Sequence, residues 1–267
     1  MTAFAARIFH QVGRQLARHL AKPLKGYSPP ATTSPQALLS CLEPGDVLLV
    51  EGDTRVSVAI KYLTQSTWSH AALYVGTRYG RADESGDMLV LVEADVLHGV
   101  RAVPLSKYAD FHSRICRPVG LEPEKIEAVL EFALARIGHQ YDLKNLVDLA
   151  RYLLPMPAVP TRSRRRMLAL GSGEPSRAIC STLIAQAFQS VRYPILPYVE
   201  YRPADTPERE QFVDEVLRAR HHSLFTPRDF DISPYFRIVK PRIEASFDPT
   251  SIRWTESDPV PLGTSEK

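Results

Sequence analysis

The residue best suited to nucleophilic chemistry is Cys180, which lies where a glycine-bearing loop runs into an apolar helix in the segment GSGEPSRAICSTLIAQAFQ. A thiol at a helix N-terminus feels the positive end of the backbone dipole, so its pKa falls below the free value of ~8.5 and more of it is thiolate. The other two cysteines fit less well. Cys116 alternates within a strand-like run and Cys41 precedes a turn, so both are expected to be inert small hydrophobic residues.

A thiolate nucleophile in acyl transfer needs a base, and the base needs a group that orients it. His70 begins an apolar strand in TQSTWSHAALYVG, and Glu93 interrupts the apolar strand MLVLVEADV. A carboxylate in such a strand is costly unless it is paired, and a hydrogen bond from a histidine ring would satisfy it. The alternatives are a purely structural histidine and a strand-end glutamate that faces water. His98 is the second candidate for the base.

The composition narrows the function classes. Three cysteines spaced 75 and 64 residues apart form neither a disulfide framework nor a zinc pattern, and we expect no metal and no organic cofactor. The net charge of only +3 does not suggest nucleic-acid binding. No apolar run reaches eighteen residues, which argues against a transmembrane helix. Free thiols suit a reducing compartment, so we expect a cytoplasmic protein, with peripheral attachment to the inner face of a membrane left open.

The N-terminal region differs from the rest of the chain. Residues 3–22 carry an apolar stripe on a predicted helix. The first 25 residues include five basic residues, and no acidic residue precedes Glu43. Arginines interrupt the stripe, which excludes a secretory signal. The segment is a helix on an anionic membrane surface, an address peptide, or a helix that packs on its own domain. We expect a helix plus a Pro/Ser/Thr linker over residues 1–39, one domain over 40–245 and a disordered tail over 246–267.

The elements that position these residues are mixed. Period-two and apolar runs predict strands over residues 47–50, 70–76, 88–94, 100–105, 113–119 and 235–240. Helical periodicity and capping residues predict helices over 54–65, 123–137, 143–154, 180–190 and 206–220. The fold class is therefore α+β, an antiparallel sheet or small barrel packed against helices.

The order of the motifs resembles a known family. LEPGDVLLVEGD, STWSHAALYVG, LVEAD with GVRAVPL, IGHQYD and ICSTLIAQAF occur in this order over residues 40–240, which is similar to the permuted papain-like amidases of the YaeF/YiiX group, circularly permuted relatives of NlpC-type peptidases. The resemblance implies a papain-like core with Cys180 as nucleophile, His70 as base and Glu93 as the third polar group. It also implies that the hydroxyl of Tyr141 and the backbone N–H of Cys180 line an oxyanion site.

Together, these observations predict a thiol-dependent hydrolase of the amidase or peptidase type that forms an acyl-enzyme on Cys180. Its substrate is expected to be a small peptide or an acyl lipid. Trp68 is expected either to line a substrate cleft or to pack in the core. Two alternatives stay open. One is a lipid acyltransferase or acylhydrolase that uses the same triad at an anionic membrane, through residues 3–22 and the cluster Arg162, Arg164, Arg165 and Arg166. The other is a binding module without catalysis.

Overall fold

The structure is a computed structural model of the 267-residue chain. It describes residues 15, 18–19, 21–24, 31, 33–95, 97–140, 179–203, 213–246 and 248–251. Most of the predicted N-terminal helix, the predicted helix over 143–154, the arginine cluster over 162–166 and the tail beyond residue 251 lie outside these ranges.

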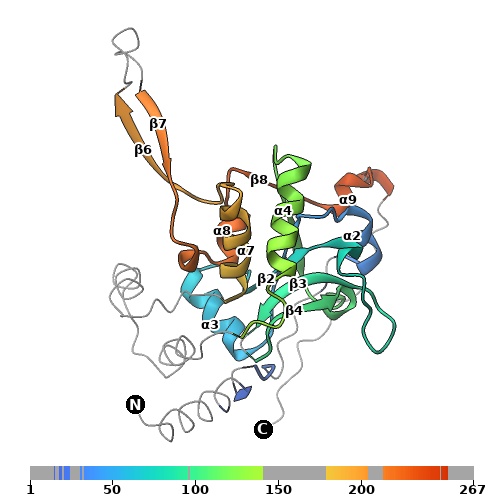
Figure 1. Ribbon diagram of the computed structural model, residues 1–267. Coiled ribbons are helices and arrows are strands. Elements are labelled where there is room, and N and C mark those ends of the chain that lie inside the picture. Colours follow the sequence, from blue (N-terminus) through green and yellow to red (C-terminus); the bar gives the residue numbers. More distant parts are fainter. Residues whose placement is uncertain are drawn as a thin grey trace, which may run out of the picture.

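A six-stranded antiparallel sheet forms the centre of the molecule, with strand order β4-β3-β2-β1-β5-β8 (Figure 1). The strands are β1 (Val47–Val50), β2 (His70–Tyr74), β3 (Leu89–Asp95), β4 (Gly99–Pro104), β5 (Ser113–Pro118) and β8 (Phe236–Val239). The predicted strands correspond to these six, with ends that differ by no more than two residues. The predicted α+β class with an antiparallel sheet is confirmed.

Side-chain alternation along the strands creates an apolar cluster on each face of the sheet. Val47 and Leu49 of β1 belong to the cluster that also contains residues of helices α4 (Pro123–Leu134) and α7 (Ile179–Ser190). Leu48 and Val50 belong to the other cluster, with residues of helix α2 (Pro35–Cys41) and the 3₁₀ helix η2 (Leu105–Tyr108). Helix α7 contacts both β2 and β3, so its first turn can reach side chains of the central strands.

Within the described ranges, the remaining helices have ten residues or fewer. They are α3 (Arg55–Thr64), α8 (Pro227–Asp231), α9 (Pro241–Glu244) and the 3₁₀ helices η1 (Gly76–Tyr79), η4 (His222–Leu224) and η5 (Pro249–Ser251). Local chemistry fixes the limits of α3, because the Thr54 side chain caps its first turn and Gln65 ends it in the left-handed conformation at φ 51°.

The helix predicted over residues 206–220 is wrong. Val213–Arg218 is instead strand β7, which pairs with β6 (Tyr198–Pro203) in a two-stranded antiparallel ribbon that projects from the body (Figure 1). Thr206 followed by a proline imitates a helix start, but residues 213–218 find a partner strand rich in tyrosine and valine. Cross-strand pairing of this kind leaves no local periodicity that would identify it.

The Pro/Ser/Thr linker predicted to run to residue 39 ends earlier than expected, because α2 begins at Pro35. The Ser34 side chain accepts a hydrogen bond from the backbone N–H of Ala37 at 3.3 Å, which is a helix N-cap. Leu38 is 2% exposed and belongs to the core cluster on the α2 face. The packed body therefore starts at least five residues before residue 40.

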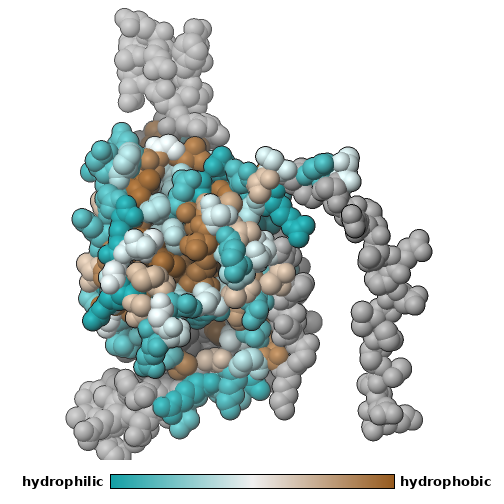
Figure 2. Space-filling view, turned by 90° about the vertical axis from the view of Figure 1, so that its right-hand side faces the viewer, coloured by the Kyte–Doolittle hydropathy of each residue, from teal (hydrophilic) through white to brown (hydrophobic). Residues whose placement is uncertain are grey.

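The surface on the α9 side of the molecule contains both hydrophobic and hydrophilic residues. Figure 2 shows hydrophobic residues gathered near the middle of this face, with hydrophilic residues around them. Helices α2 and α9 contact each other, and Leu39 and Ile243 on them are 52% and 61% exposed. Exposed apolar residues are usual on folded proteins, so they imply no partner here. Within the described ranges, no helix is long and apolar enough to cross a membrane.

Candidate active site

Cys180 is the second residue of α7, as the loop-to-helix pattern predicted. It is 4% exposed. Its Sγ lies 3.8 Å from Oγ of Ser181, and the backbone of Ala71 in β2 contributes to lowering the pKa of the thiol. The free N–H groups of a helix first turn carry partial positive charge. Cys180 is therefore held against β2 in an environment that favours a negative sulfur.

His70 is the first residue of β2 and lies between the thiol and the carboxylate. Its Nε2 is 3.0 Å from Oε2 of Glu93, and the ring lies close enough to the Cys180 thiol for each group to shift the pKa of the other. Since Nε2 is engaged by Glu93, Nδ1 is the ring nitrogen left for the sulfur. The histidine thus has the two partners that a base in a triad requires.

Glu93 is fully buried, with four donors around its carboxylate. Oε1 accepts hydrogen bonds from Arg101 Nε at 2.9 Å and from Lys107 Nζ. Oε2 accepts hydrogen bonds from His70 Nε2 and from the Tyr108 hydroxyl. A carboxylate offers about four lone-pair sites, so Glu93 is saturated. Its orientation, and with it the orientation of the His70 ring, is fixed.

The pKa values of the three groups move together. Burial alone would raise the pKa of Cys180, but the charge and hydrogen bond of His70 outweigh it and lower the pKa below its usual 9.0. Burial would likewise lower the pKa of His70, but Cys180 and Glu93 raise it to about 10. The pKa of Glu93 falls well below its ordinary range, because the His70 and Lys107 interactions exceed the effect of burial. These directions favour a thiolate–imidazolium pair beside an ionised Glu93.

The sequence prediction found the three groups that converge but missed the shell around Glu93. Arg101 lies opposite Glu93 in the β3–β4 register, and Lys107 and Tyr108 come from η2. One sequence signal could have identified Arg101, since it interrupts the apolar run GVRAVPL next to the strand that contains Glu93. Lys107 and Tyr108 follow a proline in a short 3₁₀ helix, for which the sequence shows no comparable pattern.

The other candidate residues lie elsewhere. The second candidate base, His98, is in the β3–β4 turn, with its Nδ1 2.9 Å from Oδ2 of Asp95 and its side chain 56% exposed. Cys116 is fully buried in the core, and this burial raises the pKa of its thiol well above the usual value. Cys41 ends α2 and is partly exposed. Tyr141 lies just outside the described residues, so its oxyanion role stays a prediction.

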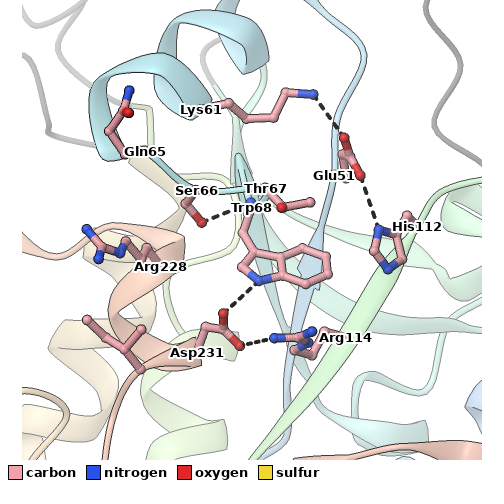
Figure 3. A pocket seen from close by; sticks show the side chains of 11 residues that line it. Glu51, Lys61, Gln65, Ser66, Thr67, Trp68, His112, Arg114, Arg228 and Asp231 are labelled. Carbon is pink, nitrogen blue, oxygen red and sulfur yellow. Dashed lines mark hydrogen bonds and ion pairs between the residues drawn. The ribbon is translucent and has the colours of Figure 1, made fainter.

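Trp68 is 2% exposed and lines an open cavity of about 650 Å³ (Figure 3). Its Nε1 donates a hydrogen bond to Oδ2 of Asp231 at 3.1 Å, and the Arg114 guanidinium lies 4.9 Å from the ring centroid. The residue therefore both packs in the core and borders a pocket, so the two alternatives for Trp68 are not exclusive.

The described residues contain no cluster of three or more His, Cys, Asp or Glu side chains that could hold a metal ion. Comparison with curated proteins gives no match. Among solved structures, the chain is similar to the crystal structure of the metalloprotein yiiX from Escherichia coli O157:H7, with 14% identity and a TM-score of 0.41 over 80% of this chain and 98% of that one.

The family comparison concerns the first part of the body. The model of the "Permuted papain-like amidase enzyme, YaeF/YiiX, C92 family" matches residues 41–152. This stretch contains His70 and Glu93 and ends before Cys180. Over residues 41–152 the chain thus has the sequence pattern of the permuted papain-like amidases, as its motifs predicted.

Proposed function

We propose that this protein is a cysteine hydrolase that cleaves an amide bond through an acyl-enzyme on Cys180. The single observation that carries the proposal is the chain of contacts from Cys180 through His70 to the buried Glu93. A thiol beside a histidine whose second nitrogen is held by a third group is the general arrangement for nucleophilic catalysis. The family match supports a hydrolase of the amidase or cysteine-peptidase type.

The reaction has two steps. In the first, the Cys180 thiolate forms a C–S bond to the substrate carbonyl, the C–N bond breaks, and the His70 imidazolium gives its proton to the leaving amine. In the second, His70 removes a proton from water, the resulting C–O bond replaces the C–S bond, and the thiolate leaves. Glu93 stabilises the imidazolium before the first step and after the second.

The negative oxygen of each tetrahedral intermediate needs hydrogen-bond donors. The backbone N–H of Cys180, in the first turn of α7, is the donor that this proposal assigns. The Tyr141 hydroxyl is proposed as the second donor.

The test measures hydrolysis of a panel of short peptide and γ-glutamyl amides. Cys180→Ser should reduce kcat/KM by about 10⁴-fold or more, since loss of the nucleophile removes most of the rate enhancement. Cys41→Ser is the matched control, because Cys41 is partly exposed and outside the triad. Mass spectrometry of the quenched wild-type enzyme should find the acyl group on Cys180. An active Cys180→Ser variant would exclude the mechanism.

The lipid alternative depends on the segments 3–22 and 162–166, so it stays a prediction together with the cytoplasmic location. Co-sedimentation of the full chain with anionic and with neutral vesicles, with and without residues 1–30, separates the two substrates. Equal behaviour in all four mixtures favours the peptide amide. The binding-module alternative is tested by a thiol-directed activity probe, which should label Cys180 and neither Cys41 nor Cys116 if the site is catalytic.

A further inference from the structure

The Trp68 cavity lies near the ends of the central strands β1 and β2, where the proposed catalytic histidine is found. His70 pairs with Val50 of β1, and Glu51, the next residue, lines the cavity. Trp68 precedes His70 by two residues and lines the cavity as well. Neighbouring strands lie about 4.8 Å apart and residues about 3.3 Å apart along a strand. The cavity therefore begins within the length of a small substrate from the triad.

The carboxylates of this cavity are already engaged (Figure 3). Glu51 accepts hydrogen bonds from Lys61 Nζ at 3.3 Å and from His112 Nδ1 at 3.1 Å, one at each oxygen. Asp231 accepts hydrogen bonds from Arg114 Nη1 at 2.5 Å and from Trp68 Nε1, again one at each oxygen. A positively charged ligand would have to compete with these donors.

Arg228 differs from the other two cations of the cavity, Lys61 and Arg114, in what it contacts. Its Nη1 donates a hydrogen bond to the backbone oxygen of Thr64 at 3.2 Å. Within the part of the chain that the structure describes, no carboxylate forms an ion pair with it. Lys61 and Arg114 are each matched by one acidic residue, so the lining has one positive charge in excess. A guanidinium with open N–H groups is well suited to a carboxylate, which it can bind in a two-point arrangement.

We infer that this cavity binds a carboxylate of the amide substrate, held by Arg228, while the scissile bond lies at Cys180. The inference rests on the proposed hydrolase function and names its substrate class: small peptides or amino-acid amides with a free carboxylate. One excess positive charge matches a carboxylate monoanion better than a phosphate dianion. The cavity volume is within the range of small-molecule sites.

The test uses Trp68 as the reporter. The chain has two tryptophans, so Trp254→Phe leaves the fluorescence of the full chain to Trp68. Three probes are titrated: N-acetyl-alanyl-alanine, its C-terminal amide and inorganic phosphate. The acid should bind about tenfold more tightly than the amide, because only the acid forms charge-assisted hydrogen bonds.

Single substitutions test whether Arg228 causes the preference for the acid over the amide. In the Trp254→Phe background, Arg228→Ala should bring the acid-to-amide preference to about one, and Arg228→Lys should restore part of it. Arg242→Ala, at an exposed arginine of α9, is the matched control and should keep the preference. Thermal unfolding of each variant checks the fold, and the acid–amide comparison in the parent protein does not depend on any arginine variant.

The outcomes are distinct. Equal binding of acid and amide, an unchanged preference in Arg228→Ala, or no binding of any probe overturns the inference. Tighter binding of phosphate than of the acid overturns it in favour of a phosphate ligand. The proposed function is tested separately by iodoacetamide labelling of Cys180. Rapid labelling without acid preference removes the cavity assignment alone, whereas acid preference with an inert Cys180 removes the hydrolase and leaves a carboxylate-binding pocket.

Discussion

Two histidine–glutamate pairs involve residues in or next to the central strands of the sheet, and they differ in what surrounds them. His70 Nε2 is 3.0 Å from Oε2 of Glu93, and His112 Nδ1 is 3.1 Å from Oε2 of Glu51. Each pair links two segments of the sheet: His70 of β2 with Glu93 of β3, and His112 before β5 with Glu51 after β1. Distance alone therefore does not identify a catalytic pair.

The surroundings do. Glu93 is fully buried with three further donors, whereas the Glu51 side chain is 13% exposed and shares its charge with Lys61. His70 also contacts a thiol at a helix N-terminus, and the ring of His112 instead lies 5.1 Å from that of Trp68. One pair polarises a nucleophile, and the other forms part of a pocket wall.

The largest expected difference between the pairs is in stability. Glu93→Gln should lower the free energy of unfolding by about 3–5 kcal/mol, because it leaves the charge of Lys107 without its carboxylate and Arg101 with Asp95 as its remaining acidic partner. Glu51→Gln, at a partly solvated pair, should cost no more than about 1 kcal/mol. Urea unfolding at pH 7 measures both values. Equal losses would mean that burial does not separate the pairs.

The second difference is in thiol reactivity. At pH 7, His70→Ala should slow alkylation of Cys180 by iodoacetamide at least ~30-fold, since a thiol of ordinary pKa is only ~3% ionised there. His112→Ala should change the rate by no more than a few-fold. Peptide mapping by mass spectrometry follows Cys180 specifically. A comparable loss in both variants would contradict the assignment of His70 as the residue that activates the sulfur.

A third comparison concerns the donors behind each glutamate. Tyr108→Phe removes one hydrogen bond to the ionised Glu93 and should cost about 2 kcal/mol. Lys61→Met removes one donor to Glu51 and should cost less than about 1 kcal/mol, because His112 still donates to this carboxylate. Thermal and urea unfolding supply the two numbers. The rate of Cys180 alkylation should fall in Tyr108→Phe, since the His70 ring loses part of its support.

The smallest expected effect is on the pH dependence of Cys180 alkylation and of kcat/KM. The pKa of Cys180 is lowered, so its thiolate persists as the pH falls below 9; the pKa of His70 is raised to about 10, so its imidazolium persists as the pH rises. Alkylation of Cys180 should therefore vary little between pH 7 and 9, and kcat/KM should decline above about pH 10. In His70→Ala the alkylation midpoint should move upward. An unperturbed midpoint in the wild type would show that the pair is not ionised.

The sequence predicts most of what local chemistry determines. Cys180, His70 and Glu93 could be singled out because each breaks the pattern of its element: a thiol at a helix start, an imidazole at a strand edge and a carboxylate inside an apolar strand. The strands of the sheet have clear apolar runs in the sequence, and the ends of these runs predict the strand limits to within two residues. Cys116 could be set aside for the same reason, as its alternation matches a core position.

What the sequence does not predict depends on partners that lie outside the local segment. The β6–β7 ribbon was missed because residues 213–218 have a helix-compatible composition and become a strand only beside 198–203. The donors of Glu93 were missed because Lys107 and Tyr108 reach it from η2 across the sheet, with no spacing that links the positions. The cavity likewise combines side chains from α3, β5 and α8.

The saturation of Glu93 has a consequence for how the protein loses activity. Its four donors come from β2, β4 and η2, so the catalytic geometry is shared among elements that must all be folded at once. On heating, the reactivity of Cys180 should not decrease at a lower temperature than that at which the secondary structure is lost. Inactivation and global melting are expected to coincide as a single cooperative event.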